Sequence, residues 1–404
     1  MSRIPVLRCL AAAALSAFAI SPAHAVSAQT TIFSFCASPA NPTCAGGGEP
    51  QSVLLPVGNQ FYGTTNELAP YDDGELFQIS MSGTLKTLKR FCKLATCKGG
   101  NSPGKYLAQA PDGTIYGVTA WGGGPNDAGE IFKLDTTGHP VAVYKFCPKP
   151  DCLDGFSPVS VVFDPAGDMF GTTIGGGRYR EGTIFEITAA GAFQKLYDFC
   201  SVGNCADGNL PGTLLFASSG ALYGTTEAGG TYQGGTLFTI VPGGSFTTLY
   251  SFCSLAACAD GYRPGAMLAQ GADGNIYGTT AAGGTTKSGT AFQWTLGGTL
   301  QTIYTFCSQP ACADGSNPQA GLVTAPDGSF YGAASGGGVN GGGALYDLTT
   351  TGTFTQVYAF CAQANCADGS APAAVPTLGS DGNLYGTTSS GGEYDDGTVY
   401  QITP

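Results

Sequence analysis

Tyr223-Gly224-Thr225-Thr226 is one copy of a phrase that recurs seven times along this chain. A Gly-x-x-aromatic phrase follows each copy after a Gly-rich stretch, as from Gly235 to Phe238. A repeat of fixed period predicts structural units that bury their faces against their neighbours. The seven copies are 54, 54, 53, 54, 54 and 54 residues apart and begin at Tyr62, Tyr116, Phe170, Tyr223, Tyr277, Tyr331 and Tyr385.

Each unit alternates short β-rich runs with turn residues. In one unit the runs cover 213–216, 221–226, 236–240 and 245–252, and we name them strands A, B, C and D. Gly-rich turns separate them, and no window shows the 3.6-residue apolar period of a helix. The sequence therefore predicts an all-β fold, a seven-bladed β-propeller with four antiparallel strands per blade.

The two ends of the repeat region complete each other. Residues 30–36 have the pattern of strand D without strands A to C, and residues 397–402 have the pattern of strand C without strand D. We expect the N-terminal strand to complete the C-terminal blade, which closes the ring and removes two exposed sheet edges. The alternative is an open solenoid, which would call for polar caps that the sequence lacks.

The N-terminal segment has the features of an export signal. Basic residues near the start precede an apolar run over 10–20, and Ala23-His24-Ala25 is a small-x-small cleavage site. A membrane anchor is disfavoured because this run is shorter than the roughly 20 residues that span a bilayer. We expect a signal peptide over 1–25, a single propeller domain over 26–404, no membrane span after cleavage, and a secreted or periplasmic protein.

The composition limits the classes of partner. The chain has 404 residues and a net charge of −12, from 16 Lys and Arg against 28 Asp and Glu. A nucleic-acid-binding protein needs clustered cations for phosphate, so we expect no nucleic-acid partner. We also expect a monomer without a cofactor, apart from the Ca²⁺ site considered below.

After Cys9 in the signal segment, the remaining fourteen cysteines all fall just after a strand D. Six pairs have the spacing C-x4-C and the first has C-x7-C. In an exported protein, one local pair per repeat predicts one local disulfide per repeat. The alternative, zinc, would require two pairs from neighbouring blades. The predicted disulfides are Cys36/Cys44, Cys92/Cys97, Cys147/Cys152, Cys200/Cys205, Cys253/Cys258, Cys307/Cys312 and Cys361/Cys366.

Variation among the repeats is concentrated on one predicted face. Because strands alternate in direction, the B–C and D–A connections emerge together, and binding sites favour such loops over a rigid frame. Aromatic and basic residues near the B–C tips are candidates for stacking on sugars or anchoring a protein, although packing over their own loop glycines is the alternative. These candidates are Tyr71, Trp121, Arg178, Tyr179, Arg180, Tyr232 and Tyr394.

The first and last B–C loops share Tyr-Asp-Asp-Gly, and ring closure makes their blades neighbours. Asp72, Asp73, Glu393, Asp395 and Asp396 should then form an acidic arc, with the four aspartates as the candidate metal ligands. Carboxylates in such an arc suit Ca²⁺, or an acid and base for glycoside cleavage, while solvated turns are the third alternative. The Ala-Asp-Gly that follows several second cysteines recurs too regularly for a unique active site, so it predicts a structural turn.

The consensus of the repeat, Asp-Gly-x-x-Tyr-Gly-Thr-Thr with Gly-Thr-x-Phe and Leu-Tyr-x-Phe, resembles the GloVer tandem-repeat family of exported bacterial proteins. The resemblance implies an extracytoplasmic repeat protein, often with a C-terminal anchoring segment, and it supplies no catalytic residues. This chain ends at Thr403-Pro404 without a hydrophobic tail and adds a cysteine pair to each repeat. We therefore expect a free, disulfide-stabilised protein.

The predicted function is an extracytoplasmic binding or scaffold propeller that recognises a glycan or a protein through the B–C/D–A face. The alternative is a carbohydrate-active hydrolase or lyase that uses the acidic arc. Nucleophilic catalysis is disfavoured because the one histidine outside the signal segment, His139, falls in a C–D turn on the opposite face. The sequence thus favours binding over catalysis.

Overall fold

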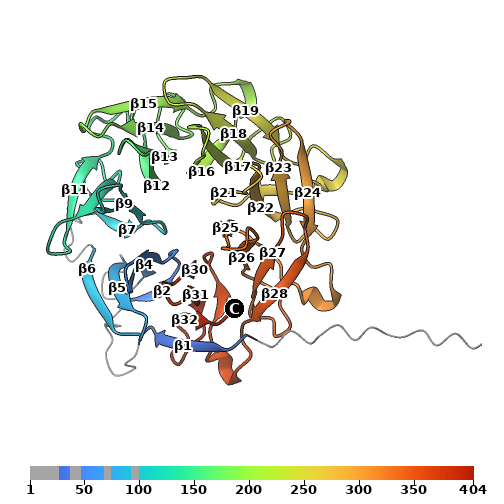
Figure 1. Ribbon diagram of the computed structural model, residues 1–404. Coiled ribbons are helices and arrows are strands. Elements are labelled where there is room, and N and C mark those ends of the chain that lie inside the picture. Colours follow the sequence, from blue (N-terminus) through green and yellow to red (C-terminus); the bar gives the residue numbers. More distant parts are fainter. Residues whose placement is uncertain (1–26, 37–46, 68–73, 92–99) are drawn as a thin grey trace, which may run out of the picture.

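The computed structural model describes residues 27–36, 47–67, 74–91 and 100–404. These residues form seven antiparallel sheets arranged as blades around a common axis (Figure 1). The predicted seven-bladed β-propeller is confirmed. The predicted signal peptide over 1–25 lies outside the described residues.

Strand A of each blade lies nearest the axis and strand D lies at the outer edge (Figure 1). Blades 1 to 3 contain β2 (Gly48–Pro50), β3 (Leu55–Val57), β4 (Gln60–Glu67), β5 (Glu75–Ser80) and β6 (Leu85–Arg90); β7 (Asn101–Pro103), β8 (Ala108–Gln109), β9 (Ile115–Trp121), β10 (Glu130–Leu134) and β11 (Pro140–Lys145); and β12 (Phe156–Phe163), β13 (Met169–Gly175), β14 (Thr183–Ile187) and β15 (Phe193–Asp198).

Blades 4 to 7 follow the same order. They contain β16 (Asn209–Phe216), β17 (Leu222–Ala228), β18 (Thr236–Ile240) and β19 (Phe246–Ser251); β20 (Tyr262–Pro264), β21 (Ala269–Gln270), β22 (Ile276–Ala282), β23 (Thr290–Trp294) and β24 (Leu300–Thr305); β25 (Leu322–Thr324), β26 (Phe330–Ala334), β27 (Ala344–Leu348) and β28 (Phe354–Ala359); and β29 (Ser370–Pro372), β30 (Thr377–Leu378), β31 (Leu384–Ser390), β32 (Thr398–Ile402) and β1 (Gln29–Ser34).

Helix in the described residues is restricted to four three-residue 3-10 turns, each ending on the second cysteine of a pair. They are η1 (Gly203–Cys205), η2 (Ala256–Cys258), η3 (Pro310–Cys312) and η4 (Ala364–Cys366).

Strand A is less regular than the repeat pattern predicts. In four blades it is split into two short strands, as β20 and β21 in blade 5. There Pro264 pairs with Thr280 and the next ladder pair is Ala269 with Tyr277, so four residues oppose two. The two extra residues bulge out of the ladder and interrupt the strand beside the axis.

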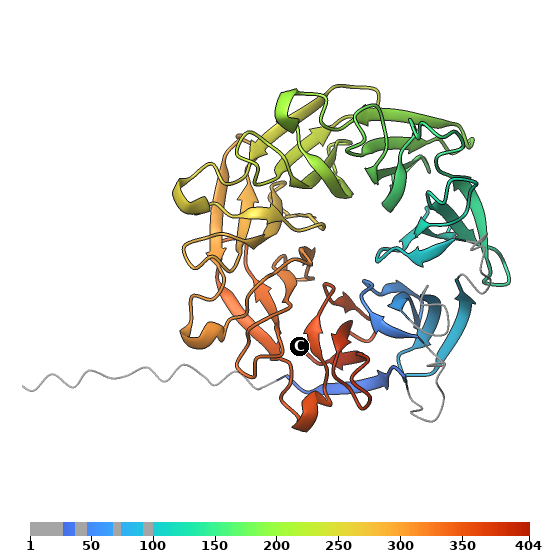
Figure 2. The same cartoon turned by 180° about the vertical axis from the view of Figure 1, so that it is seen from behind.

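The ring closes through a composite blade. β1 pairs antiparallel with β32, from Gln29 opposite Ile402 to Ser34 opposite Thr398. Both views show the N-terminal strand lying along the outer edge of the C-terminal blade (Figures 1 and 2). This confirms the predicted closure.

The recurrent phrase has a defined role at each position. Gly224 lies opposite Phe238 on the neighbouring strand, and the Phe238 ring occupies the space that a Cβ at Gly224 would need. The hydroxyl of Thr225 donates to the carbonyl of Gly265 in the next blade, at 2.9 Å. The Thr226 hydroxyl accepts the N–H of Thr236, where strand C begins. The phrase therefore joins strands B and C and connects one blade to the next.

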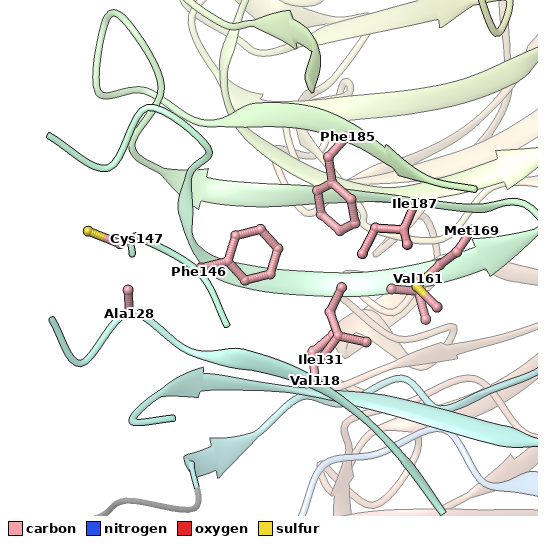
Figure 3. Packing of buried hydrophobic residues seen from close by; sticks show 9 residues of the cluster. All are labelled: Val118, Ala128, Ile131, Phe146, Cys147, Val161, Met169, Phe185 and Ile187. Atoms are coloured by element: carbon pink, nitrogen blue, oxygen red, sulfur yellow. The ribbon is translucent and has the colours of Figure 1, made fainter. Parts of the chain in front are cut away.

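Aromatic and aliphatic side chains fill the space between blades. Between blades 2 and 3, Phe146 and Ile131 face Phe185, Val161 and other buried residues (Figure 3). The rings of Phe146 and Phe185 meet edge to face, with centroids 5.2 Å apart. Burial of these side chains between neighbouring blades holds them together.

A Gly–Pro contact recurs at every interface between blades. Gly235, at the start of strand C, has φ +90°, and a Cβ there would lie 2.7 Å from Cδ of Pro264 in the next blade. At five interfaces the residue before the proline also donates its N–H to the preceding blade, as Arg263 does to Gly234. The seven pairs are Gly74/Pro103, Gly129/Pro158, Gly182/Pro211, Gly235/Pro264, Gly289/Pro318, Gly343/Pro372 and Gly397/Pro50.

Candidate functional site

In blades 3 to 7 the B–C loop packs on the cysteine loop that leads into the same blade. In blade 4 the N–H of Gly230 donates to the carbonyl of Cys205 at 2.9 Å. The same bond joins Gly177 to Cys152, Gly284 to Cys258, Gly338 to Cys312 and Gly392 to Cys366. The B–C and D–A connections therefore lie on one face, which we call the loop face.

Five of the predicted disulfides are present. They join Cys147 to Cys152, Cys200 to Cys205, Cys253 to Cys258, Cys307 to Cys312 and Cys361 to Cys366. Because these sulfurs are bonded to each other, they are not thiolate ligands for zinc. Cys44, Cys92 and Cys97, which belong to the first two predicted pairs, lie outside the described residues.

An aspartate organises each of these cysteine loops. Asp314 Oδ2 accepts hydrogen bonds from Tyr304 Oη at 2.8 Å and from the N–H and hydroxyl of Ser308, while Oδ1 accepts the Gln309 N–H. Burial raises the pKa of Asp314, but these hydrogen bonds outweigh burial and hold it below its usual range. Burial and the neighbouring Asp314 raise the pKa of Tyr304 to about 12.

The same Tyr–Asp hydrogen bond occurs in four other blades. The pairs are Tyr144/Asp154, Tyr197/Asp207, Tyr250/Asp260 and Tyr358/Asp368. These recurrent aspartates therefore have a structural role.

The predicted aromatic candidates lie on different blades of the loop face. Trp121, at the end of β9, is 45% exposed and stacks on Phe156 of the next blade, with ring centroids 6.5 Å apart. Tyr179 is half-exposed, with the Arg178 guanidinium 5.7 Å from its ring centroid. Tyr232 is also half-exposed.

The tips of these loops lie over the outer strand. The Arg178 N–H donates to Asp198, the Tyr232 N–H donates to Ser251, and the Glu393 N–H donates to Ser34. Each acceptor ends the outermost strand of its blade. Tyr179, Tyr232 and Tyr394 therefore lie toward the rim of blades 3, 4 and 7, and Arg180 belongs to the same tip as Tyr179. Tyr71 lies outside the described residues.

Three of the five residues of the acidic arc, Glu393, Asp395 and Asp396, can be described. Asp395 Oδ1 accepts the Gly391 N–H at 3.0 Å, which orders its own loop. Burial, and then the charge of Asp395, raise the pKa of Asp396. Asp72 and Asp73 lie outside the described residues, and within the described ranges no three His, Cys, Asp or Glu side chains group closely enough to hold a metal ion. Calcium binding and glycoside cleavage by the arc stay predictions.

Two cavities adjoin at the axis, on the loop face. The larger has a volume of about 390 Å³ and is walled by Val159, Ile174 and Leu210 on its apolar side. The smaller, of about 170 Å³, is walled by polar residues that include Asn317 and Ser335. Both reach Lys105, Gln319, Ala320 and Ala373, so we call them together the channel mouth.

Two positions of the repeat contribute side chains to the channel mouth, and both vary from blade to blade. One follows the Tyr-Gly-Thr-Thr phrase, and the other precedes the interface proline. The first set is Asn66, Ala120, Ile174, Glu227, Ala281, Ser335 and Ser389, and the second is Glu49, Ser102, Ser157, Leu210, Arg263, Asn317 and Ala371. The residues at these positions that line the cavities are Ile174, Glu227, Ser335, Ser389, Leu210, Asn317 and Ala371. The rest of the repeat is nearly the same in every blade, so the residues at these two positions decide the polarity of the mouth. Ile174 and Leu210 make one side apolar, and Asn317 and Ser335 make the other side polar.

The channel mouth contains groups that the sequence analysis missed. Ile174 and Leu210 are exposed apolar side chains. Lys105 replaces an uncharged residue in strand A, and Tyr106 beside it has its pKa raised to about 12 by burial. Comparison of the repeats position by position along strand A could have found Lys105, because the other six repeats have an uncharged residue there.

The chain resembles known proteins both in sequence, through a family model, and in shape, through solved structures. A family model described as the Gloeobacter/Verrucomicrobia repeat matches residues 18–218 and 202–400. The chain belongs to this repeat family. The match confirms the resemblance found in the Tyr-Gly-Thr-Thr phrase. A search of curated proteins finds no match to the sequence.

Solved structures of similar shape are distant in sequence. Virginiamycin B lyase from Staphylococcus aureus has a TM-score of 0.58 at 15% identity, covering 88% of this chain and 95% of that one. The extracellular domain of a hybrid two-component-system protein from B. thetaiotaomicron has 0.55 at 10% identity, covering 88% of this chain and 38% of that one. A puromycin hydrolase has 0.53 at 14% identity, covering 84% and 50%. At these identities the likeness supports the propeller fold alone.

Among the described residues, no helix has the length and apolar character required to cross a membrane.

Proposed function

We propose that this member of the Gloeobacter/Verrucomicrobia repeat family is an extracytoplasmic binding propeller that takes a glycan at the channel mouth of its loop face. The observation that carries the proposal is the pairing of a constant frame with variable residues around one concave site.

The extracytoplasmic part of the proposal rests on the disulfides. Five local disulfides occur in the described residues, and such bonds persist in oxidising compartments outside the cytoplasm. The apolar run over 10–20 with its cleavage site supports export independently.

The binding part rests on the shape and lining of the larger cavity. Its volume of about 390 Å³ is in the range of small-ligand sites. Val159, Ile174 and Leu210 provide an apolar wall, while Lys105 and Gln319 provide hydrogen-bond donors. Such a mixture suits one or two sugar rings, which combine apolar ring faces with hydroxyl groups.

A glycan fits this site better than a folded protein partner. A stable protein interface usually buries roughly 800 Å² on each side, with aromatic anchors near its centre. The exposed rings of Tyr179 and Tyr232 instead lie toward the rim of separate blades. A sugar chain needs only the concave mouth.

A glycan array probed with the purified protein tests this proposal. The variant Ile174→Thr, Leu210→Asn keeps a β-branched residue in β13 and an Asn, which tolerates the left-handed φ of +55°, at position 210. We expect affinity for the glycan found to fall about tenfold, a loss of about 1.4 kcal/mol. The control Val241→Thr changes an exposed residue in the C–D turn on the other face and should bind as the wild type does.

Two results would overturn the proposal. One is the absence of any bound glycan, and the other is equal binding by the mouth variant and the wild type.

A further inference from the structure

The charge distribution at the channel mouth differs from that of the whole molecule. The chain has 28 Asp and Glu against 16 Lys and Arg. The smaller cavity nevertheless has no carboxylate in its lining, and Lys105 is its one charged residue. An ammonium group in an acid-free cavity of an acidic protein is a site suited to an anion.

Lys105 is not part of the repeated frame. It lies two residues after the interface proline, between β7 and β8. The residues at this position in the other blades are uncharged, namely Ser52, Ser160, Thr213, Ala266, Ala320 and Ala374. The lysine is therefore a feature of one blade, and the repeat architecture does not require it.

The backbone of Lys105 is held in place while its ammonium group has no ion-pair partner among the described residues. The Lys105 carbonyl accepts the Val53 N–H of the neighbouring blade at 3.0 Å. Within the described part of the chain, the ion pairs join Arg90, Lys145, Lys195 and Arg263 to acids and do not include Lys105. The Lys105 side chain stays exposed to solvent at the cavity, although neighbouring protein atoms desolvate the amine in part and so lower its pKa.

Neutral donors line the same cavity as Lys105. Gln51 and Gln319 line the smaller cavity with Lys105, and their amides can donate to an oxyanion. The one carboxylate in the larger cavity, Glu227, is paired with Arg263, with Nε 3.0 Å from Oε1. The carboxylate that lines the larger cavity is therefore already paired with a cation, and Lys105 is the remaining charged residue of the two linings.

We propose that the channel mouth binds the anionic group of its ligand, a carboxylate, sulfate or phosphate, against Lys105 with help from the amides of Gln51 and Gln319. This inference rests on the proposed function, because it names the chemistry of the ligand that enters the same site. The ammonium group attracts the anion as a point charge, and the amide N–H groups orient it through directional hydrogen bonds.

The test follows Lys105 directly and does not require the natural ligand. Lysines of the full protein are ¹³C-methylated, the Lys105 resonance is assigned with Lys105→Gln, and glucuronate, sulfate and phosphate are titrated separately at constant ionic strength. We expect a saturable shift of the Lys105 resonance with at least one anion and none with neutral glucose. The three arms identify which anionic group is preferred.

Variants provide the matched comparison. Lys105→Gln should weaken binding of the preferred anion at least tenfold, and Lys105→Arg should retain it. Lys287→Gln is the control, because Lys287 is exposed on a B–C tip and blade 4 already carries Gln233 at the equivalent left-handed position. A circular dichroism melt of each variant checks that the fold is intact.

The outcomes separate this inference from the proposed function. A Lys105 resonance that does not saturate with any anion, or an equal loss in Lys287→Gln, overturns the anion site. If Lys105→Gln binds the array glycan fully while Ile174→Thr, Leu210→Asn does not, the anion site is wrong and the binding function stands. If neither variant loses affinity, both are wrong.

Discussion

Pro50 of the first blade packs directly on Gly397 of the last blade, so that a Cβ at Gly397 would lie 2.7 Å from Pro50 Cδ. Beside it the N–H of Glu49 donates to the carbonyl of Asp396 at 3.0 Å. The junction that closes the ring therefore uses the same contact as the six junctions within the chain. Apart from the pairing of β1 with β32, the junction that closes the ring has the same Gly–Pro packing as the other junctions between blades.

Gly397→Ala should destabilise the ring strongly. The new Cβ would meet Pro50 and, closer still, the Thr388 carbonyl, at a φ of +89° that alanine disfavours. We expect the free energy of unfolding to fall by about 3 kcal/mol, from backbone strain and overpacking together. Gly382→Ala has a similar φ of +81° with nothing within 4 Å, so it should lose only about 1 kcal/mol. Equal losses in urea denaturation would contradict the interface contact.

Removal of one disulfide should cost a modest amount of stability. Cys253 and Cys258 close a loop of only a few residues, so the loop-entropy model gives about 2 kcal/mol for the bond. Cys253→Ala, Cys258→Ala should therefore lower the free energy of unfolding by that amount in urea denaturation. Leu255→Ala, which changes an exposed side chain in the same loop, keeps the bond and serves as the control. A loss below about 0.5 kcal/mol would show that the remaining hydrogen bonds already hold the loop.

Asp314→Asn should remove a pH-dependent contribution to stability. Hydrogen bonds hold the pKa of Asp314 below its usual range, so its contribution is present above its unfolded pKa and is lost as the pH falls through the folded value. At pH 7 the variant should be less stable by about 2 kcal/mol. The difference from the wild type should shrink as the pH falls below about 4. Urea denaturation between pH 7 and pH 3 measures it, and a difference independent of pH would refute the assignment.

Tyr400→Phe should stabilise the protein. Tyr400 occupies the position of Phe238 in blade 4, and among the described residues its buried hydroxyl has no hydrogen-bond partner. Removal of this group should gain about 1 kcal/mol in the free energy of unfolding. Tyr358→Phe is the comparison, because its hydroxyl donates to Asp368 at 2.8 Å and its loss should cost about 1 kcal/mol. Thermal melts of the two variants should therefore shift in opposite directions.

Much of the fold could be predicted because the same pattern of strand and turn residues recurs seven times in the sequence. The opposition of Gly224 and Phe238 and the start of strand C at Thr236 follow from short phrases within one unit. The break in strand A could not be predicted, because the bulge between Pro264 and Ala269 depends on the register with strand B. Register is a property of the paired strands and not of one run of residues.

The candidate site could be predicted only in part. The B–C loops were recognisable as a variable face, but their tips lie over the outer strand, as the bond from Tyr232 to Ser251 shows. The variable positions at the axis are single residues at the ends of strands, as Ile174 and Leu210 are, and no local pattern distinguishes them from the frame.

The sequence by itself determined the number of blades, the order of strands, the ring closure and the five cysteine pairs seen in the described residues, because each depends on residues close together or on a strict period. Only the tertiary structure decided what stands at the channel mouth. Gln51, Lys105 and Gln319 are far apart in the chain, and they line one cavity because rotation about the propeller axis brings the first two residues after the interface proline of different blades to one point.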